Sequence, residues 1–92
     1  MVHSKKNILG MELMVYEHRG CEVKIAEFPE SSSATIYLVE SKNPGKGIAT
    51  ETLAYLKGYY EGHGMTLYSS VALNDRMAFI LKKLKIKEII NK

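Results

Sequence analysis

A glycine-rich segment at residues 43–50, NPGKGIAT, is the part of this chain whose residue types best suit chemistry. It follows an apolar run and precedes a stretch with helical spacing of apolar residues. Gly45 and Gly47 allow the backbone to bend tightly and to approach a ligand closely. The first N–H groups of a following helix have no partner within that helix and favour anions. The segment therefore predicts a site for phosphate or pyrophosphate.

Two known phosphate-binding loops do not fit this segment. A Walker A loop places Gly-Lys immediately before Ser or Thr, whereas Gly45-Lys46 precedes Gly47. A dinucleotide-binding fingerprint has a third glycine where Thr50 stands, and it follows the first strand of a parallel sheet. Nucleotide hydrolysis and dinucleotide binding by these routes are therefore not predicted.

Composition and charge limit the classes of binding partner that the sequence predicts. A net charge of +3 suits a polyanion, either a phosphorylated cofactor or nucleic acid. Tyr55, Tyr59 and Tyr60 have the helical spacing of packing residues, which speaks against a base-stacking platform for nucleic acid. No apolar run approaches the roughly 20 residues that span a membrane. Cys21 is the single cysteine, so no disulfide and no metal site is predicted, and a reducing, cytoplasmic compartment fits.

The first half of the chain indicates strands. Residues 1–7 are polar and basic without periodicity, and we expect a flexible arm. Residues 11–16 and 21–28 have strand-like patterns, and the connection at 17–20 predicts a hairpin. The run at 34–39 is almost continuously apolar, which predicts a central strand buried on both faces.

The second half alternates helices and strands. Residues 48–61 predict an amphipathic helix, and 65–71 a strand that follows it as in a crossover between parallel strands. Asn74 suits the N-cap of a second helix, and 86–90 suit a last short strand. We therefore expect one α/β domain over residues 1–92 with a mixed sheet. A domain of this size buries only about 60–65% of its unfolded surface, so dimerisation to a homodimer would help it.

The glycine-rich segment resembles the acetyl-CoA-binding motif of the GNAT-type N-acetyltransferase superfamily. That motif runs Arg or Gln, two residues, Gly, one residue, then Gly or Ala, and Pro44 to Ala49 match it with one departure, at Pro44. The resemblance covers about residues 11–88, where the order of expected strands and helices agrees with this family. It implies a GNAT-like fold and coenzyme A as the phosphorylated ligand.

The resemblance also implies which residues bind the cofactor. Backbone N–H groups at the start of the helix would hold the pyrophosphate, and the end of the central strand would pair with the pantetheine arm. The implied cofactor-binding residues are Leu38, Val39, Gly45, Lys46, Gly47, Ile48, Ala49, Thr50 and Asn74.

The implied activity is transfer of acetyl from acetyl-CoA to an amine, favoured by orienting the reactants. Leu81 stands where many family members carry an acidic tyrosine, so Tyr68 is the candidate acid and Glu40 the candidate acceptor of the amine proton. The alternatives are that Tyr68 only packs and that Glu40 is only solvated. Because Pro44 and Leu81 depart from the family pattern, a second hypothesis is a non-catalytic interaction protein that has lost acetyl transfer.

Overall fold

A single mixed sheet of six strands forms the frame of the protein in the computed structural model, which describes residues 2–8, 10–42, 47–70 and 75–89. The strands are β1 (Val2–Ile8), β2 (Met11–His18), β3 (Cys21–Phe28), β4 (Ser33–Ser41), β5 (Thr66–Ser69) and β6 (Lys87–Glu88). The helices are η1 (Pro29–Ser31), α1 (Ile48–Gly62) and α2 (Asp75–Lys83). Strands lie in the sheet in the order in which they occur along the chain.

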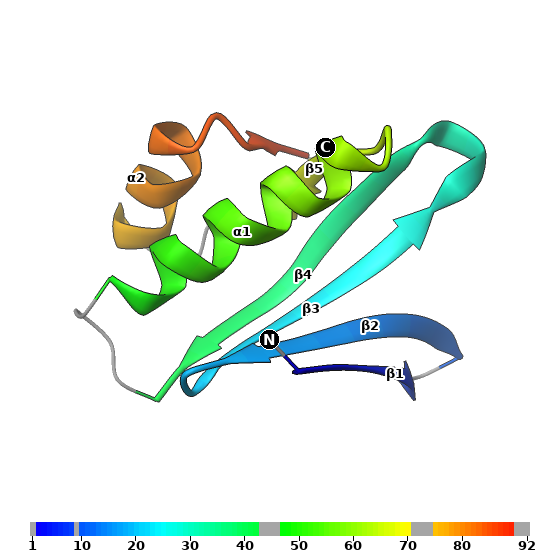
Figure 1. Cartoon of the computed structure of the whole chain (residues 1–92), viewed down its shortest axis with the longest axis horizontal. Coiled ribbons are helices and arrows are strands. Elements are labelled where there is room, and N and C mark those ends of the chain that lie inside the picture. Colours follow the sequence, from blue (N-terminus) through cyan, green and yellow to red (C-terminus); the bar gives the residue numbers. More distant parts are fainter. Residues whose placement is uncertain (1, 9, 43–46, 71–74, 90–92) are drawn as a thin grey trace.

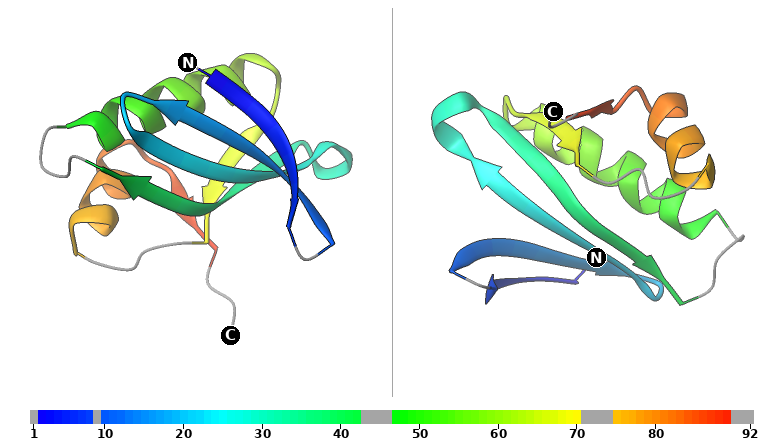
Figure 2. Two further views of the ribbon diagram at one scale, coloured as in Figure 1. Left: turned by 90° about the horizontal axis from the view of Figure 1, so that it is seen from below. Right: turned by 180° about the vertical axis from the view of Figure 1, so that it is seen from behind.

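Strand directions divide the sheet into two parts. The first four strands pair antiparallel, while β5 runs parallel to β4 and β6 runs parallel to β5. Two parallel neighbouring strands need a crossover connection. Helix α1 provides it between β4 and β5, and α2 provides it between β5 and β6. Both helices lie on the same side of the sheet (Figures 1 and 2). The expected α/β architecture with antiparallel strands first, a crossover, a second helix and a short last strand is confirmed at this level.

The first residues of the chain differ from expectation. Residues 2–8 form β1 rather than a flexible arm, and they pair with β2 from Val2 opposite Glu17 to Ile8 opposite Met11. An edge strand has only one neighbour, and lysines on it are common because they discourage further pairing. Polar residues at 3–7 therefore gave no apolar alternation from which a strand could be predicted.

The β2–β3 connection is tighter than residues 17–20. Glu17 and His18 still pair with Glu22 and Cys21, so only Arg19 and Gly20 form the turn. Both have positive φ, 52° and 84°, as in the two-residue hairpin turns whose twist matches that of the strands.

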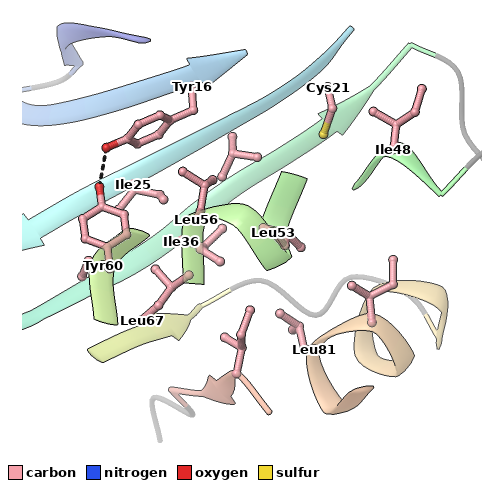
Figure 3. Close-up of a cluster of buried hydrophobic side chains, with 14 residues drawn as sticks. Tyr16, Cys21, Ile25, Ile36, Ile48, Leu53, Leu56, Tyr60, Leu67 and Leu81 are labelled. Atoms are coloured by element: carbon pink, nitrogen blue, oxygen red, sulfur yellow. Dashed lines mark hydrogen bonds between the residues drawn. The ribbon is translucent and has the colours of Figure 1, made fainter. Parts of the chain in front are cut away.

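A hydrophobic core fills the space between the sheet and the two helices (Figure 3). Leu53, Leu56 and Tyr60 form the buried stripe of α1, as their spacing predicts, and Ile80 and Leu81 are buried on α2. Full burial of one leucine or isoleucine stabilises the fold by about 1.5–3 kcal/mol. The buried cluster comprises Tyr16, Cys21, Val23, Ile25, Ala34, Ile36, Ile48, Leu53, Leu56, Tyr60, Leu67, Ile80, Leu81 and Ile86.

Two glycines flank the C-cap of α1. The helix ends at Gly62, His63 is the C-cap, and Gly64 has a φ of 74°. The N–H of Met65 donates to the carbonyl of Tyr60 at 2.9 Å, which reverses the chain toward β5. The strand itself, Thr66–Ser69, is shorter than the expected 65–71.

Candidate functional site

The strands β4 and β5 part at their carboxyl ends. They pair from Ser33 opposite Thr66 to Ile36 opposite Ser69, and the N–H of Ser70 makes one more bond to the carbonyl of Ile36 at 2.9 Å. β4 then continues to Ser41 along β3. Within the described part of the chain, residues 37–41 therefore have no strand on the β5 side. Backbone groups on such an edge can bind an extended ligand as an added strand.

A β-bulge in β4 lies where the two strands part. Ile36 is opposite Ile25, but the next pair joins Leu38 to Lys24, so Tyr37 is the extra residue. A bulge bends its strand and increases the local twist, which helps to turn the end of β4 away from β5. The sequence contains no glycine or other signal that predicts this bulge.

The amino end of α1 follows this opening along the chain. Gly47 is the N-cap residue of α1 and has a left-handed φ of 73°. Because glycine has no side chain, it supplies no capping hydrogen bond to the helix. The first helical bond runs from the N–H of Glu51 to the carbonyl of Gly47 at 3.0 Å. The N–H groups of Ile48, Ala49 and Thr50 therefore precede the helical ladder and are oriented to bind an anion.

Most of the expected cofactor-binding residues can be placed. Val39 faces the core and Leu38 the opposite side of the sheet, and both are half-buried in the open stretch of β4. Ile48 is buried and Ala49 packs on the core, so these two would contact a ligand through the backbone. Thr50 is half-buried in the first turn. Gly45, Lys46 and Asn74, like Pro44, lie outside the described residues.

The two candidate catalytic residues are not brought together. Tyr68 is half-buried in β5 opposite Thr35, one residue before the end of the strand. Glu40 is exposed near the end of β4, five residues beyond Thr35, which corresponds to roughly 15 Å along the strand. Tyr68 therefore lies close to the point where β4 and β5 part, and Glu40 lies at the far end of the opening.

Leu81 and Cys21 are both in the core. The side chain of Leu81 is only 1% exposed, so α2 presents an apolar group to the core at this position. Cys21 is fully buried, and burial raises the pKa of its thiol. A buried thiol with a raised pKa is a poor nucleophile, and Cys21 belongs to the core cluster.

An ionic cluster beside the start of α1 was not anticipated from the sequence. Nε2 of His18 lies 2.5 Å from Oε1 of Glu51, and a guanidinium nitrogen of Arg19 lies 3.8 Å from the same oxygen. The hydrogen bond from His18, with the nearby charge of Arg19, holds the pKa of the Glu51 carboxyl below its usual range. The N–H of Lys42 also donates to the carbonyl of Gly20 at 3.1 Å, so the β2–β3 turn, the end of β4 and α1 meet here.

The described residues contain neither a membrane-spanning helix nor a metal-binding cluster. No helix there combines the length and apolar character that crossing a membrane requires. No group of three His, Cys, Asp or Glu side chains there is arranged to hold a metal ion. A small open pocket lined by residues 27–31 belongs to the turn at η1, at the other end of β4 from the opening, and only this turn lines it.

The fold and site define a small α/β domain with an opening between two parallel strands. Comparison of the chain with family models, with curated proteins and with solved structures gave no match.

Proposed function

We propose that this protein binds acetyl-CoA in the opening between β4 and β5 and transfers its acetyl group to an amine. The observation that carries the proposal is that β4 extends beyond its pairing with β5 and is followed along the chain by the amino end of α1, whose first N–H groups have no partner within the helix. An extended amide-bearing arm and a pyrophosphate need these two elements side by side.

The two parts of the ligand suit different parts of the site. The pantetheine arm carries amides, which would pair with the backbone of residues 37–41 as an added strand. The pyrophosphate is anionic, and the N–H groups of Ile48, Ala49 and Thr50 together with the positive end of the helix dipole favour it. Gly47 keeps the approach to these groups open, since no atom lies within 4 Å of the position of an added Cβ.

The chemistry is direct transfer. The neutral amine nitrogen attacks the thioester carbonyl carbon, a C–N bond forms and the C–S bond breaks. The amine loses one proton to solvent, and the departing thiolate takes one up. Tyr68 is the residue we assign to donate that proton, because it lies beside the point where β4 and β5 part. Glu40 is too far along β4 to act on the same atoms, so it has no assigned role.

Calorimetric titration with acetyl-CoA at two salt concentrations tests the binding site. Gly47→Glu places a negative charge beside the proposed pyrophosphate and should weaken binding at least about tenfold. Gly58→Glu is the matched control, because it adds the same charge to an exposed, uncrowded position in the middle of α1. Equal binding by the two variants, with both folded, would show that the anion site has been misplaced.

Release of free coenzyme A in the presence of candidate amines tests the transfer. Tyr68→Phe should lower kcat and leave the Kd for acetyl-CoA unchanged if the hydroxyl donates the proton. Unchanged turnover would remove Tyr68 from the mechanism.

A second candidate function is interaction without catalysis in the same fold. Leu81 favours it, because a buried leucine offers no proton at that position. Acetyl-CoA binding with no coenzyme A release for any amine would support this alternative.

A further inference from the structure

The hydroxyl of Ser70 lies at the closed end of the opening between β4 and β5. Its Oγ donates to the carbonyl of Ile36 at 2.9 Å, and the N–H of the same residue donates to the same carbonyl at 2.9 Å. These bonds follow directly on the last pair of the two strands, Ile36 opposite Ser69. Ile36 and Ser69 are fully buried, whereas Ser70 is exposed. An exposed residue with a hydroxyl group therefore lies where the strands part.

The two bonds from Ser70 leave its hydroxyl with acceptor capacity only. A carbonyl oxygen has two lone pairs, and Ser70 supplies a donor to each of those on Ile36. A serine hydroxyl has one proton and two lone pairs. Because its proton is bonded to the carbonyl of Ile36, the Oγ of Ser70 can only accept from a further group. A ligand that binds Ser70 through this oxygen must therefore bring an N–H or O–H donor.

The acetyl transfer needs an acceptor of this kind as well as a donor. Tyr68, two residues earlier in the chain, is assigned to give a proton to the departing thiolate. The attacking amine has the opposite requirement, because its nitrogen carries N–H groups and must direct its lone pair at the thioester carbonyl carbon. An acceptor that holds one N–H group orients that lone pair. Ser70 offers this acceptor at the same end of β5 as Tyr68.

We propose that Ser70 orients the attacking amine by accepting a hydrogen bond from one of its N–H groups. This inference rests on the proposed acetyl transfer and names a positioning residue for it. The C–N bond forms and the C–S bond breaks as described above, and the proton that the nitrogen loses still goes to solvent. Ser70 takes up no proton and forms no covalent bond.

A purely structural role for Ser70 predicts a different result. If its two bonds only close the β4–β5 ladder, loss of the hydroxyl alters the strand edge on which the pantetheine arm is proposed to bind, and acetyl-CoA binding weakens. If Ser70 orients the amine, the KM of the amine rises while the Kd for acetyl-CoA stays the same. Measuring both constants on the same variants therefore separates the two roles.

Ser70→Thr and Ser70→Val form the decisive pair of variants. Threonine and valine have nearly the same shape, and only threonine carries a hydroxyl. Both residues suit a position at the end of a strand, so the pair decides the test even if Ser70→Ala does not fold. Ser31→Ala is the control, because Ser31 also donates to a backbone carbonyl, that of Phe28 at 3.3 Å, but lies in η1 at the other end of β4. Circular dichroism establishes that each variant is folded.

The test measures coenzyme A release with n-butylamine, spermidine and Nα-acetyl-lysine, and acetyl-CoA binding by calorimetry. Ser70→Val and Ser70→Ala should raise the KM of the best of these amines about tenfold, while Ser70→Thr and Ser31→Ala keep the wild-type value. The Kd for acetyl-CoA should be unchanged in all four variants. Equal KM values for Ser70→Thr and Ser70→Val, or a Kd for acetyl-CoA that rises together with the KM, would overturn this inference and leave the proposed function standing. Acetyl-CoA binding without coenzyme A release by the wild type would overturn the transfer itself, and this inference with it.

Discussion

The imidazole of His18 donates a hydrogen bond of 2.5 Å from Nε2 to the carboxylate of Glu51, joining the tip of the β2–β3 hairpin to the first turn of α1. The two residues are 33 positions apart in the chain. A carboxylate in the first turn of a helix is also favoured by the helix dipole. The contact therefore fixes the amino end of α1, which is the proposed anion site, against the antiparallel part of the sheet.

This contact predicts a pH-dependent contribution from Glu51. Its pKa in the folded protein is below the usual value, chiefly because His18 donates a hydrogen bond to it. The contribution is therefore present above the usual glutamate pKa of about 4.3 and is lost as the pH falls through the lower folded value. The free energy of unfolding of Glu51→Gln should accordingly lie below that of the wild type at pH values where the carboxylate is ionised, and the two should converge in acid. Glu30→Gln, at an exposed glutamate of η1, is the control, and a difference that is constant with pH would contradict the assignment.

Two glycines of the α1 region should respond oppositely to alanine. Gly47 has a φ of 73° although its surroundings are open, so Gly47→Ala should destabilise the protein by about 1–2 kcal/mol through backbone strain alone. Gly58 lies within α1 with open space around it, so Gly58→Ala should stabilise it by about 0.5–1 kcal/mol. Urea denaturation measures both changes. The same sign for both variants would mean that Gly47 does not hold the left-handed conformation.

A buried chain of hydroxyls predicts loss of stability in alkali. The hydroxyl of Tyr60 bonds to that of Tyr16 at 2.8 Å (Figure 3). It also donates to Glu27 at 2.8 Å, and burial raises the pKa of Tyr60 far above 10.0. Only the unfolded chain then loses this proton above about pH 10, so the free energy of unfolding falls by about 1.4 kcal/mol per pH unit on its account.

Replacing Tyr60 removes both the bond and this dependence. Tyr60→Phe should lower the stability by about 1–2 kcal/mol at neutral pH and make the decline in alkali shallower. Tyr55→Phe, at a tyrosine of α1 that is 57% exposed, should keep the wild-type decline. Equal slopes for wild type and Tyr60→Phe would show that Tyr60 ionises in the folded state.

Cys21 should react with thiol reagents only when the protein opens. The side chain is fully buried, and burial raises the pKa of the thiol, so both access and ionisation oppose attack. The labelling rate should therefore rise with urea in parallel with the unfolded fraction. Rapid labelling under native conditions would indicate an opening of the core between β3 and α1.

The spacing of apolar residues in the sequence was sufficient to predict the central elements β3 and α1. The patterns at 21–28 and 48–61 predicted a strand and a helix, because the core requires apolar residues at regular spacing there. The apolar residues of these patterns, Cys21, Val23, Ile25, Leu53, Leu56 and Tyr60, are buried in the structure. Elements with little buried surface were predicted less well. β1 has polar residues at the sheet edge, so packing imposed no readable pattern on it, and β6 covers only Lys87–Glu88 of the expected 86–90.

The candidate site was predicted in part. The sequence located Gly47 and the start of α1, because backbone conformation at a helix start depends on local residue types. It did not predict the bulge at Tyr37 or the distance between Tyr68 and Glu40, because both depend on the register between strands. An alternating pattern with a period of two predicts which face of the sheet a residue occupies. It does not predict which residue of the neighbouring strand lies opposite.

The sequence by itself determined the local and periodic features of this protein: the hairpin, the crossover helix, the glycine at its start and the side chains of the core. Those features follow from conformational preference and from burial within single elements. Three features were decided by the tertiary structure alone. β4 extends beyond its pairing with β5, and His18 contacts Glu51. Both helices cover one face of the sheet, and the opposite face carries Glu17, Glu22 and Glu40 side by side on neighbouring strands. These relationships join residues far apart in the chain, and they arise because close packing of the whole sheet and its helices fixes one register and one set of contacts.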